Sequence, residues 1–312
     1  MHAEVLAVGE PMVEFNQAQP GEPRYLQGFG GDSSNMIIAA ARSGARTAYV
    51  TRLGDDEFGR EFLELWRREG VDASGVGIDP QAPTAVYFVT HGPHGHVFSY
   101  LRAGSAASRM GPADLPLEAI RNARFVHASG ISMAISASAH DAVLEAFAAA
   151  RSAGAKVAFD SNLRLKLWPL AWAREAIGAA AGLADCFFPS IEDARALSGL
   201  EAADAIVDWA HGLGAKTVFL KLGPEGVTVS DGTTRERIAG HKVNAVDATG
   251  AGDCFCGATL ARLCAGDSVF EAARYANAAA ALATTGFGAV APLPRPEAVR
   301  ALLERGGEPR PV

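Results

Sequence analysis

The chain is poor in cysteine and in positive charge, and each shortage excludes a class of protein. Four cysteines among 312 residues are too few for a disulfide scaffold, and we expect Cys254 and Cys256 to be small core residues. The formal net charge of −7 argues against a nucleic-acid-binding protein, which usually presents a basic face. We therefore expect no nucleic-acid partner.

Long hydrophobic runs are missing as well. No stretch of about 18 apolar residues occurs, so no membrane partner is expected. The opening residues, MHAEVLAVGEP, lead into a predicted strand and lack the layout of a signal peptide. A cytoplasmic protein is the expectation.

Two familiar nucleotide-binding motifs are also absent. There is no GxxxxGK[ST] loop and no strand-borne GxGxxG, so a P-loop or Rossmann protein loses its main support. Any phosphate site in this chain must be built in another way.

What is present is a regular alternation of short apolar strands with helical patterns. This alternation is typical of βα units around a largely parallel sheet, and 312 residues can bury a large core as one α/β domain. The predicted strands are 5–9, 47–51, 125–129, 156–160, 186–190 and 217–221, and the predicted helices are 33–43, 56–69, 138–153, 171–182, 201–213, 251–265 and 268–284.

One segment, 84–108, interrupts this alternation. It is predicted to form two strands joined by a GPHG turn. Together with the segment 12–16, we interpret its strands, 84–102, as a small β lid over the site. No repeat, linker or low-complexity tract divides the chain, so residues 1–312 are expected to form a single domain.

The most informative stretch is AVDATGAGDCFCGATL, which opens a predicted helix. Gly250, Ala251 and Gly252 form a turn of small residues, and exposed N–H groups at a helix start bind anions. Asp253 follows in the first turn, where a carboxylate can accept the proton of a hydroxyl that attacks a phosphate. Asp247 is better placed to organise a cation or the turn. The alternative is a plain tight turn with a helix-start carboxylate.

A second glycine pair stands near the other end of the chain, in GFGGDSSNMIIAAARSG. Asp32 and Asn35 offer acceptors and amide donors suited to sugar hydroxyls, and Gly31 permits close approach of a ligand to the backbone. Ordinary helix capping is the alternative. As a pair, the GG…N and DATGAGD segments resemble the two signatures of the ribokinase-like, or PfkB, family of carbohydrate kinases, and the resemblance covers nearly the whole chain.

The resemblance implies a ribokinase-like sandwich with a largely parallel central sheet and a small β lid. It implies that Asp253 is the catalytic base and that the amides of Gly250 to Gly252 hold the transferring phosphate. ATP and Mg²⁺ are the implied cofactors, a monovalent cation remains open, and we expect a homo-oligomer, in the first place a dimer. Residues matching the family's nucleotide side are Lys221, Gly223, Asn277, Gly286 and Gly288. A surface role for Lys221 and ordinary C-caps at the last glycines are the alternatives.

The chain departs from the family pattern at the magnesium motif. Many members carry NxxE, whereas this chain has PSIED, with Ser190 and Asp193 at the corresponding spacing. Asp193 thus stands in place of the motif's glutamate, with a side chain that is one methylene shorter. We therefore expect Asp193 to contact the metal through water.

Two arginines are candidates for binding the sugar that accepts the phosphoryl group. Arg102 follows a lid strand and Arg164 follows a core strand, and an arginine can bind a carboxylate through two parallel hydrogen bonds. Tyr87 and Tyr100 can add hydroxyl contacts. Alternatively, Arg102 is a solvated lid residue, Arg164 pairs with an acid or a helix end, and the tyrosines pack across the strands.

SYLRAGSAAS and FDSNLRLKLW are similar to the corresponding segments of the 2-keto-3-deoxygluconate kinases. This similarity implies transfer of the ATP γ-phosphoryl group to a primary hydroxyl of the sugar acid, giving 2-keto-3-deoxy-6-phosphogluconate. Another kinase of this fold, of the fructokinase or ribokinase type, and a noncatalytic sugar-binding regulator are the alternatives. On the first interpretation the acceptor site is lined by Gly31, Asn35, Tyr87, Tyr100, Arg102, Arg164 and Asp253.

Overall fold

The computed structural model describes residues 3–92 and 95–306. Its main sheet contains β1 (Val5–Val8), β4 (Thr47–Gly54), β5 (Val71–Asp79), β8 (Phe125–Ser129), β9 (Lys156–Asp160), β10 (Cys186–Phe188), β11 (Thr217–Lys221), β12 (Gly226–Ser230) and β13 (Arg235–Ala239). Their order is β13-β12-β11-β10-β9-β8-β1-β4-β5. The strands from β11 to β5 pair in parallel, whereas β12 is antiparallel to both of its neighbours. The carboxyl ends of the parallel strands therefore meet at one edge.

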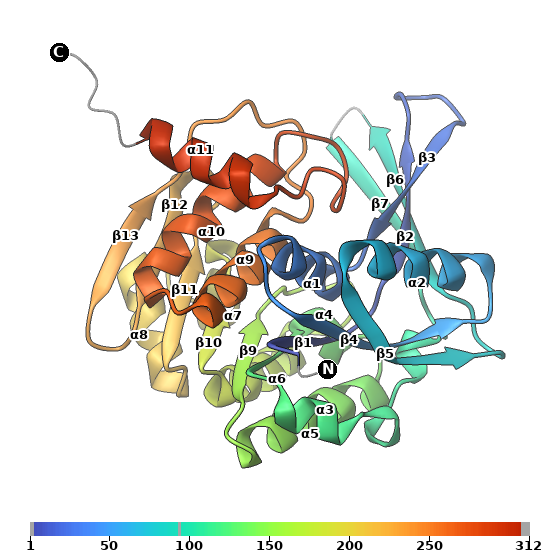
Figure 1. Cartoon of the computed structure of the whole chain (residues 1–312), viewed down its shortest axis with the longest axis horizontal. Coiled ribbons are helices and arrows are strands. Elements are labelled where there is room, and N and C mark those ends of the chain that lie inside the picture. The colour runs from blue at the N-terminus through green and yellow to red at the C-terminus, as the bar shows by residue number, and fades with distance from the viewer. Residues whose placement is uncertain (1–2, 93–94, 307–312) are drawn as a thin grey trace.

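Helices cover both faces of this sheet, as Figure 1 shows. Successive side chains of a strand point to opposite faces, so Val126 packs into one apolar core and Phe125 into the other. The first core is closed by α3 (Leu117–Asn122), α4 (Gly130–Ala134), α5 (Ala137–Ser152), α6 (Leu170–Leu183), α7 (Ile191–Ser198) and α8 (Ala203–Leu213). The second is closed by α1 (Asp32–Arg42), α2 (Glu57–Glu69), α9 (Ala251–Ala265), α10 (Val269–Ala283) and α11 (Pro296–Gly306). The expected α/β sandwich is confirmed.

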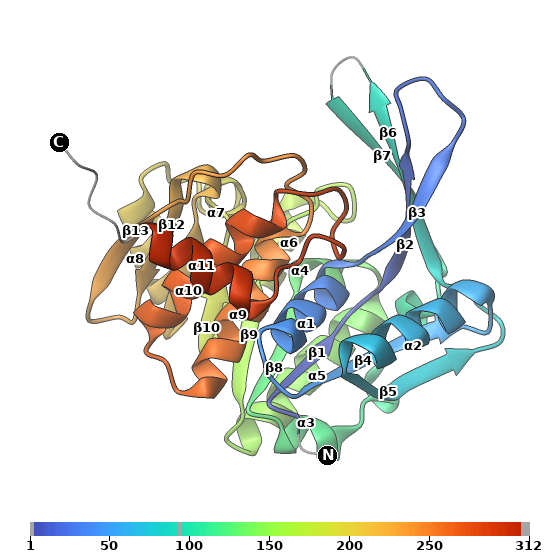
Figure 2. The same ribbon diagram turned by 45° about the horizontal axis from the view of Figure 1, so that its top comes forward.

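A second, smaller sheet forms the lid. It contains β2 (Met12–Gln17), β3 (Tyr25–Gly30), β6 (Ala85–Gly92) and β7 (Gly95–Leu101), in the order β3-β2-β6-β7. Figure 2 shows these strands extending away from the main sheet on the side of α1 and α2. Pro93 and His94, in the predicted GPHG turn, lie outside the described residues. The two predicted lid segments do pair, because β2 lies parallel to β6.

Every predicted strand and helix corresponds to an observed one, with small shifts at the ends. The prediction missed β3, β5, β12, β13, the shorter helices α3, α4 and α7, and the 11-residue helix α11. β13, with the sequence RERIA, is an edge strand, and charged side chains on such a strand hide the apolar pattern that marks a buried one. Short 3₁₀ turns at Ala107–Arg109, Pro112–Asp114 and Gly223–Glu225 complete the described elements. Among the described helices, none is long and apolar enough to cross a bilayer.

Candidate active site

The start of α9 has the features of an anion site. Gly250 enters the helix in the left-handed conformation, with φ 76°, and a Cβ there would lie 3.0 Å from the carbonyl oxygen of Ala289. Among the described residues, no side chain caps this helix start. The Ala251 amide already donates to the carbonyl oxygen of Ala248 at 3.2 Å, whereas the Gly252 amide beside it lacks a partner within the helix, so this amide and the positive end of the dipole are available to a phosphate. Asp253 lies in this first turn.

Close packing of α1 against α9 brings the two glycine motifs together. A Cβ on Gly257 would overlap the carbonyl oxygen of Met36, so only glycine allows this approach. As a result, Asn35 Nδ2 donates to Asp253 Oδ2 at 2.8 Å. The other amide atom of Asn35, Oδ1, is buried and finds no hydrogen-bond partner in the described part of the chain. The site therefore holds a fixed carboxylate beside an unused acceptor that suits a hydroxyl.

The surroundings of Asp253 give it the pKa of a base that works near neutral pH. The residue is partly exposed, but burial of its carboxyl group raises the pKa to about 7. This net value already includes the neighbouring groups: the Asp32 carboxylate also raises the pKa, whereas the hydrogen bond from Asn35 lowers it. General bases are most effective when their pKa lies near the working pH.

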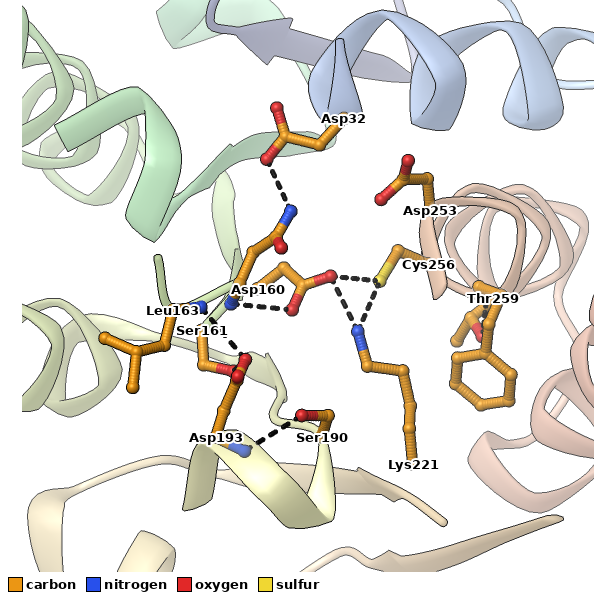
Figure 3. A network of polar contacts seen from close by, with 12 residues as sticks. Asp32, Asp160, Ser161, Leu163, Ser190, Asp193, Lys221, Asp253, Cys256 and Thr259 are labelled. Atoms are coloured by element: carbon orange, nitrogen blue, oxygen red, sulfur yellow. Dashed lines mark hydrogen bonds and ion pairs between the residues drawn. The ribbon is translucent and has the colours of Figure 1, made fainter. Parts of the chain in front are cut away.

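A buried ion pair lies beneath the start of α9 (Figure 3). Lys221, at the end of β11, places Nζ 2.7 Å from Oδ2 of Asp160, at the end of β9. Cys256 is buried, as expected, but its thiol also donates to the same carboxylate at 3.3 Å. Burial lowers the pKa of Lys221, but the Asp160 carboxylate more than offsets this, so the pKa is raised and the ammonium keeps its charge.

Lys221 is therefore largely covered, with 15% of its side chain exposed, and does not extend over the surface. A Cβ on Gly252 would lie 3.4 Å from its Nζ, so the ammonium lies next to the start of α9, on the side of the main sheet. This placement suits a charge that supports the phosphate site. Contact between Lys221 and the phosphate itself stays a prediction. The partner Asp160 was missed as a site residue, although its position at a strand end was a usable signal.

The lid contributes two tyrosines and an arginine. Tyr87 is buried and donates its hydroxyl hydrogen to Glu14, while Tyr100 is 38% exposed and lies beside Tyr87, with 5.9 Å between ring centroids. Because the Tyr87 proton is engaged, its oxygen can offer only lone pairs to a ligand. The guanidinium of Arg102 lies 5.8 Å from the Tyr100 ring centroid.

Arg102 is not the solvated lid residue of the alternative interpretation. It forms an ion pair with Glu10, which is 1% exposed and also accepts from Ser105 Oγ at 2.6 Å. Burial raises the pKa of Glu10, against the opposing effect of Arg102. Arg102 Nε is buried and has no hydrogen-bond partner among the described residues. Glu10 directly follows the first strand, but nothing in the local sequence indicates its pairing with Arg102.

Arg164 and Asp193 lie on the other side of the site. Arg164 is exposed and donates to the carbonyl of Leu163 at 2.8 Å, so its contact with an acceptor stays a prediction. Asp193 Oδ2 accepts from Ser161 Oγ at 2.8 Å and from the Leu163 amide at 3.0 Å. Asp193 thus anchors the turn after β9, whether or not it also contacts a metal through water.

Besides Lys221, the residues assigned to the nucleotide side are Gly223, which follows β11, and Asn277, Gly286 and Gly288 in the C-terminal part of the chain. Asn277 donates to the carbonyl of Ala239 at 2.8 Å and so secures the end of β13. The Gly288 amide donates to Asp247 Oδ2 at 3.0 Å, and Asp247 also accepts from the amide and hydroxyl of Thr249. Asp247 therefore organises the turn. Gly286 borders Pro292, and Gly223 opens the 3₁₀ turn after β11; their contacts with a nucleotide stay predictions.

The described residues do not by themselves form a complete metal site. Within 3–92 and 95–306, no three histidine, cysteine or acidic side chains gather so as to hold a metal ion. Magnesium bound mainly by nucleotide phosphates and water needs no such cluster, since Mg²⁺ keeps several waters. The donor set fits a metal carried in with a nucleotide.

Comparisons with known proteins agree with this geometry. The model of the pfkB family carbohydrate kinase matches residues 2–296. A 2-dehydro-3-deoxygluconokinase of Thermoproteus tenax is 38% identical over 310 residues, which cover 96% of this chain and 94% of the relative. A probable fructokinase-4 of Arabidopsis thaliana is 34% identical over 319 residues, with 96% of each chain covered.

A crystal structure from E. coli that contains ATP and Mg²⁺ has a TM-score of 0.90 at 26% identity, and the match covers 97% of this chain and 99% of that chain. The family match spans most of the chain, and the related structure superposes over nearly all of it. The chain belongs to the pfkB family of carbohydrate kinases and has its ribokinase-like fold.

Proposed function

We propose that this kinase transfers the γ-phosphoryl group of ATP to 2-keto-3-deoxygluconate, giving 2-keto-3-deoxy-6-phosphogluconate. The observation that carries the proposal is the buried, unpartnered Nε of Arg102. A buried donor without a partner is costly, and a ligand carboxylate would satisfy it. A sugar acid supplies that carboxylate, and the relative at 38% identity bears the corresponding name.

Asp253 accepts the proton of the primary hydroxyl as its oxygen attacks the γ-phosphorus and the bond to the β–γ bridging oxygen breaks. The amides of Gly250 to Gly252 stabilise the charge on the transferring phosphoryl group, and Lys221 adds positive charge from the end of β11. Asn35 orients Asp253 through Nδ2. Its free Oδ1 can accept a hydrogen bond from an acceptor hydroxyl.

ATP fits the uncapped start of α9, where backbone donors are available to its phosphates. Mg²⁺ supplies Lewis-acid neutralisation of the phosphate oxygens. Asp193 Oδ2 already accepts two hydrogen bonds, so Oδ1 is the oxygen left to contact a water of the magnesium ion. Asp247 is the residue we assign to a monovalent cation, should one be required.

Fructose is the second candidate acceptor, and one observation favours it. Glu10 already pairs with Arg102, so the guanidinium carries less unbalanced charge toward a ligand than an isolated arginine would. A neutral sugar would leave that pair undisturbed, and a probable fructokinase is 34% identical. A noncatalytic regulator is the third candidate, which the intact Asp253 and glycine turn disfavour.

An acceptor panel with ADP detection tests the proposal. We expect 2-keto-3-deoxygluconate to be phosphorylated with a higher kcat/KM than fructose or ribose. A preference for fructose would refute the sugar-acid assignment, and ligand binding without turnover would support the regulator.

Arg164→Ala adds a second arm to this experiment. We expect kcat/KM toward the acid to fall by a factor that corresponds to a loss of about 2 kcal/mol in transition-state stabilisation. This value is near the low end for a charged hydrogen bond because Arg164 is exposed. The loss toward a neutral sugar should be much smaller. Equal losses toward both acceptors would show that Arg164 does not recognise the carboxylate.

Two finer proposals concern the whole protein. We propose a cytoplasmic location and a homo-dimeric assembly. Fractionation and light scattering of the full chain test them, and a monomer would refute the second.

A further inference from the structure

The turn that follows β9 contains an unusual backbone conformation. Asn162 has φ 29° and is the one non-glycine residue with positive φ among the described residues. Asparagine tolerates this region better than most residues, but the conformation is still strained. Strain of this kind persists only where the surrounding structure fixes it. The contacts around the turn show what fixes it.

The turn is fastened at several points. Asp193 Oδ2 accepts from Ser161 Oγ on one side of Asn162 and from the Leu163 amide on the other. The backbone amide of Asn162 donates to Asp160 Oδ1 at 3.3 Å. Ser161 is fully buried, and its carbonyl oxygen sits where a Cβ on Gly130 would be. The backbone around Asn162 therefore has little freedom.

The fixed turn aims the Asn162 side chain at the acceptor side. Asn162 Nδ2 donates to Asp32 Oδ2 at 2.8 Å and so links the turn to α1; Figure 3 shows Asp32 with a dashed contact on this side of the site. Asp32 opens α1, three residues before Asn35, which holds Asp253. Asn162 thus fixes the carboxylate of Asp32, in the first turn of α1. Asn35, in the same turn, fixes the carboxylate of Asp253 in α9.

We propose that Asn162 is a positioning residue for the sugar and that Asp193 acts on the acceptor side through it. The residue aligned with the magnesium motif would then have a second task, which is to hold the turn that orients Asp32. The proposal rests on the kinase activity of the proposed function but not on the identity of the acceptor. Its test uses whichever sugar the wild-type enzyme phosphorylates best.

The two tasks of Asp193 need different chemistry, which makes them separable. Contact with a metal or its water requires the negative charge, whereas anchoring the turn requires only an acceptor oxygen. Asp193→Asn keeps the oxygen and removes the charge. Asp193→Ala removes both.

The experiment measures KM for the sugar, KM for ATP, kcat and Mg²⁺ dependence in the full chain. We expect Asn162→Gly to raise the sugar KM roughly 10-fold or more, as for loss of a hydrogen bond to a charged group, while KM for ATP changes little. Glycine adopts the positive φ without strain, so this variant should fold. Asp193→Ala should raise the sugar KM similarly, and Asp193→Asn should leave it near the wild-type value.

A double variant, Asn162→Gly with Asp193→Ala, decides whether the two residues act along one path. We expect its sugar KM to match that of the single variants, because the second change removes a support that no longer acts. Additive losses would overturn the link between Asp193 and Asn162. An unchanged sugar KM in Asn162→Gly, or equal falls in all kinetic constants, would overturn the positioning role. A wild-type preference for fructose would refute the sugar-acid assignment alone.

Discussion

The pKa of Asp253 predicts a specific pH dependence of catalysis. A carboxyl group whose pKa is raised keeps its proton to higher pH, so the base is lost as the pH falls below about 7. With that value, about one tenth of the enzyme carries the free base at pH 6 and about nine tenths at pH 8. We therefore expect kcat/KM to be about 10-fold higher at pH 8 than at pH 6.

Two variants should move the acidic limb of the pH profile, where kcat/KM falls as Asp253 gains a proton, in opposite directions. Asp32→Asn removes the like charge that raises the pKa of Asp253, so the limb should shift to lower pH. Asn35→Ala removes the hydrogen bond that lowers the pKa, so the limb should shift to higher pH. Opposite shifts cannot arise from a general loss of stability.

Asp253→Asn completes the series. We expect kcat to fall about 10²–10⁴-fold, the usual contribution of a positioned base, and the pH dependence to flatten while ATP binding persists. The assay is initial rate against pH at saturating ATP and Mg²⁺, with folding checked by circular dichroism. Equal wild-type kcat/KM at pH 6 and pH 8 would refute the raised pKa, and near-normal turnover of Asp253→Asn would remove this residue from the mechanism.

Three further substitutions test the architecture of the site. Gly252→Val should block productive ATP placement in a folded protein, measured as kcat/KM for ATP, because a Cβ fits there at 3.4 Å from Lys221 Nζ but the branched side chain would stand at the helix start where the phosphate is expected; normal activity would contradict the anion site. Glu10→Ala should lower the free energy of unfolding in urea by about 3–5 kcal/mol, since it leaves Arg102 buried without its partner, and Glu10→Gln should cost less; equal losses would show that the pair's charge is unimportant. Gly257→Val should destabilise the protein by at least about 1–3 kcal/mol and reduce kcat, because α1 must move away from α9; unchanged thermal unfolding and kcat would show that the close approach is dispensable.

The local sequence predicted the elements whose side chains carry strong periodic signals. The buried parallel strands are continuous apolar runs, and α9 begins after a turn of small residues with an acid in its first turn, so both were identifiable without the fold. The assignment of Asp253 as the candidate base rested on the same turn and stays a prediction. The edge strand β13 could not be identified in this way, because its charged side chains give little apolar pattern.

Long-range pairings were decided only by the tertiary structure. Asn35 meets Asp253 across 218 positions of the chain, and Arg102 meets Glu10 across 92. The role of Asp193 as an anchor for the turn at Asn162 was equally hidden, since its motif suggested a metal. Helix starts and strand runs depend on neighbouring residues, so the sequence determines them directly. Which carboxylate faces which amide depends on how α1, α9 and the strand ends pack, and that packing sets the burial, partners and pKa of each group.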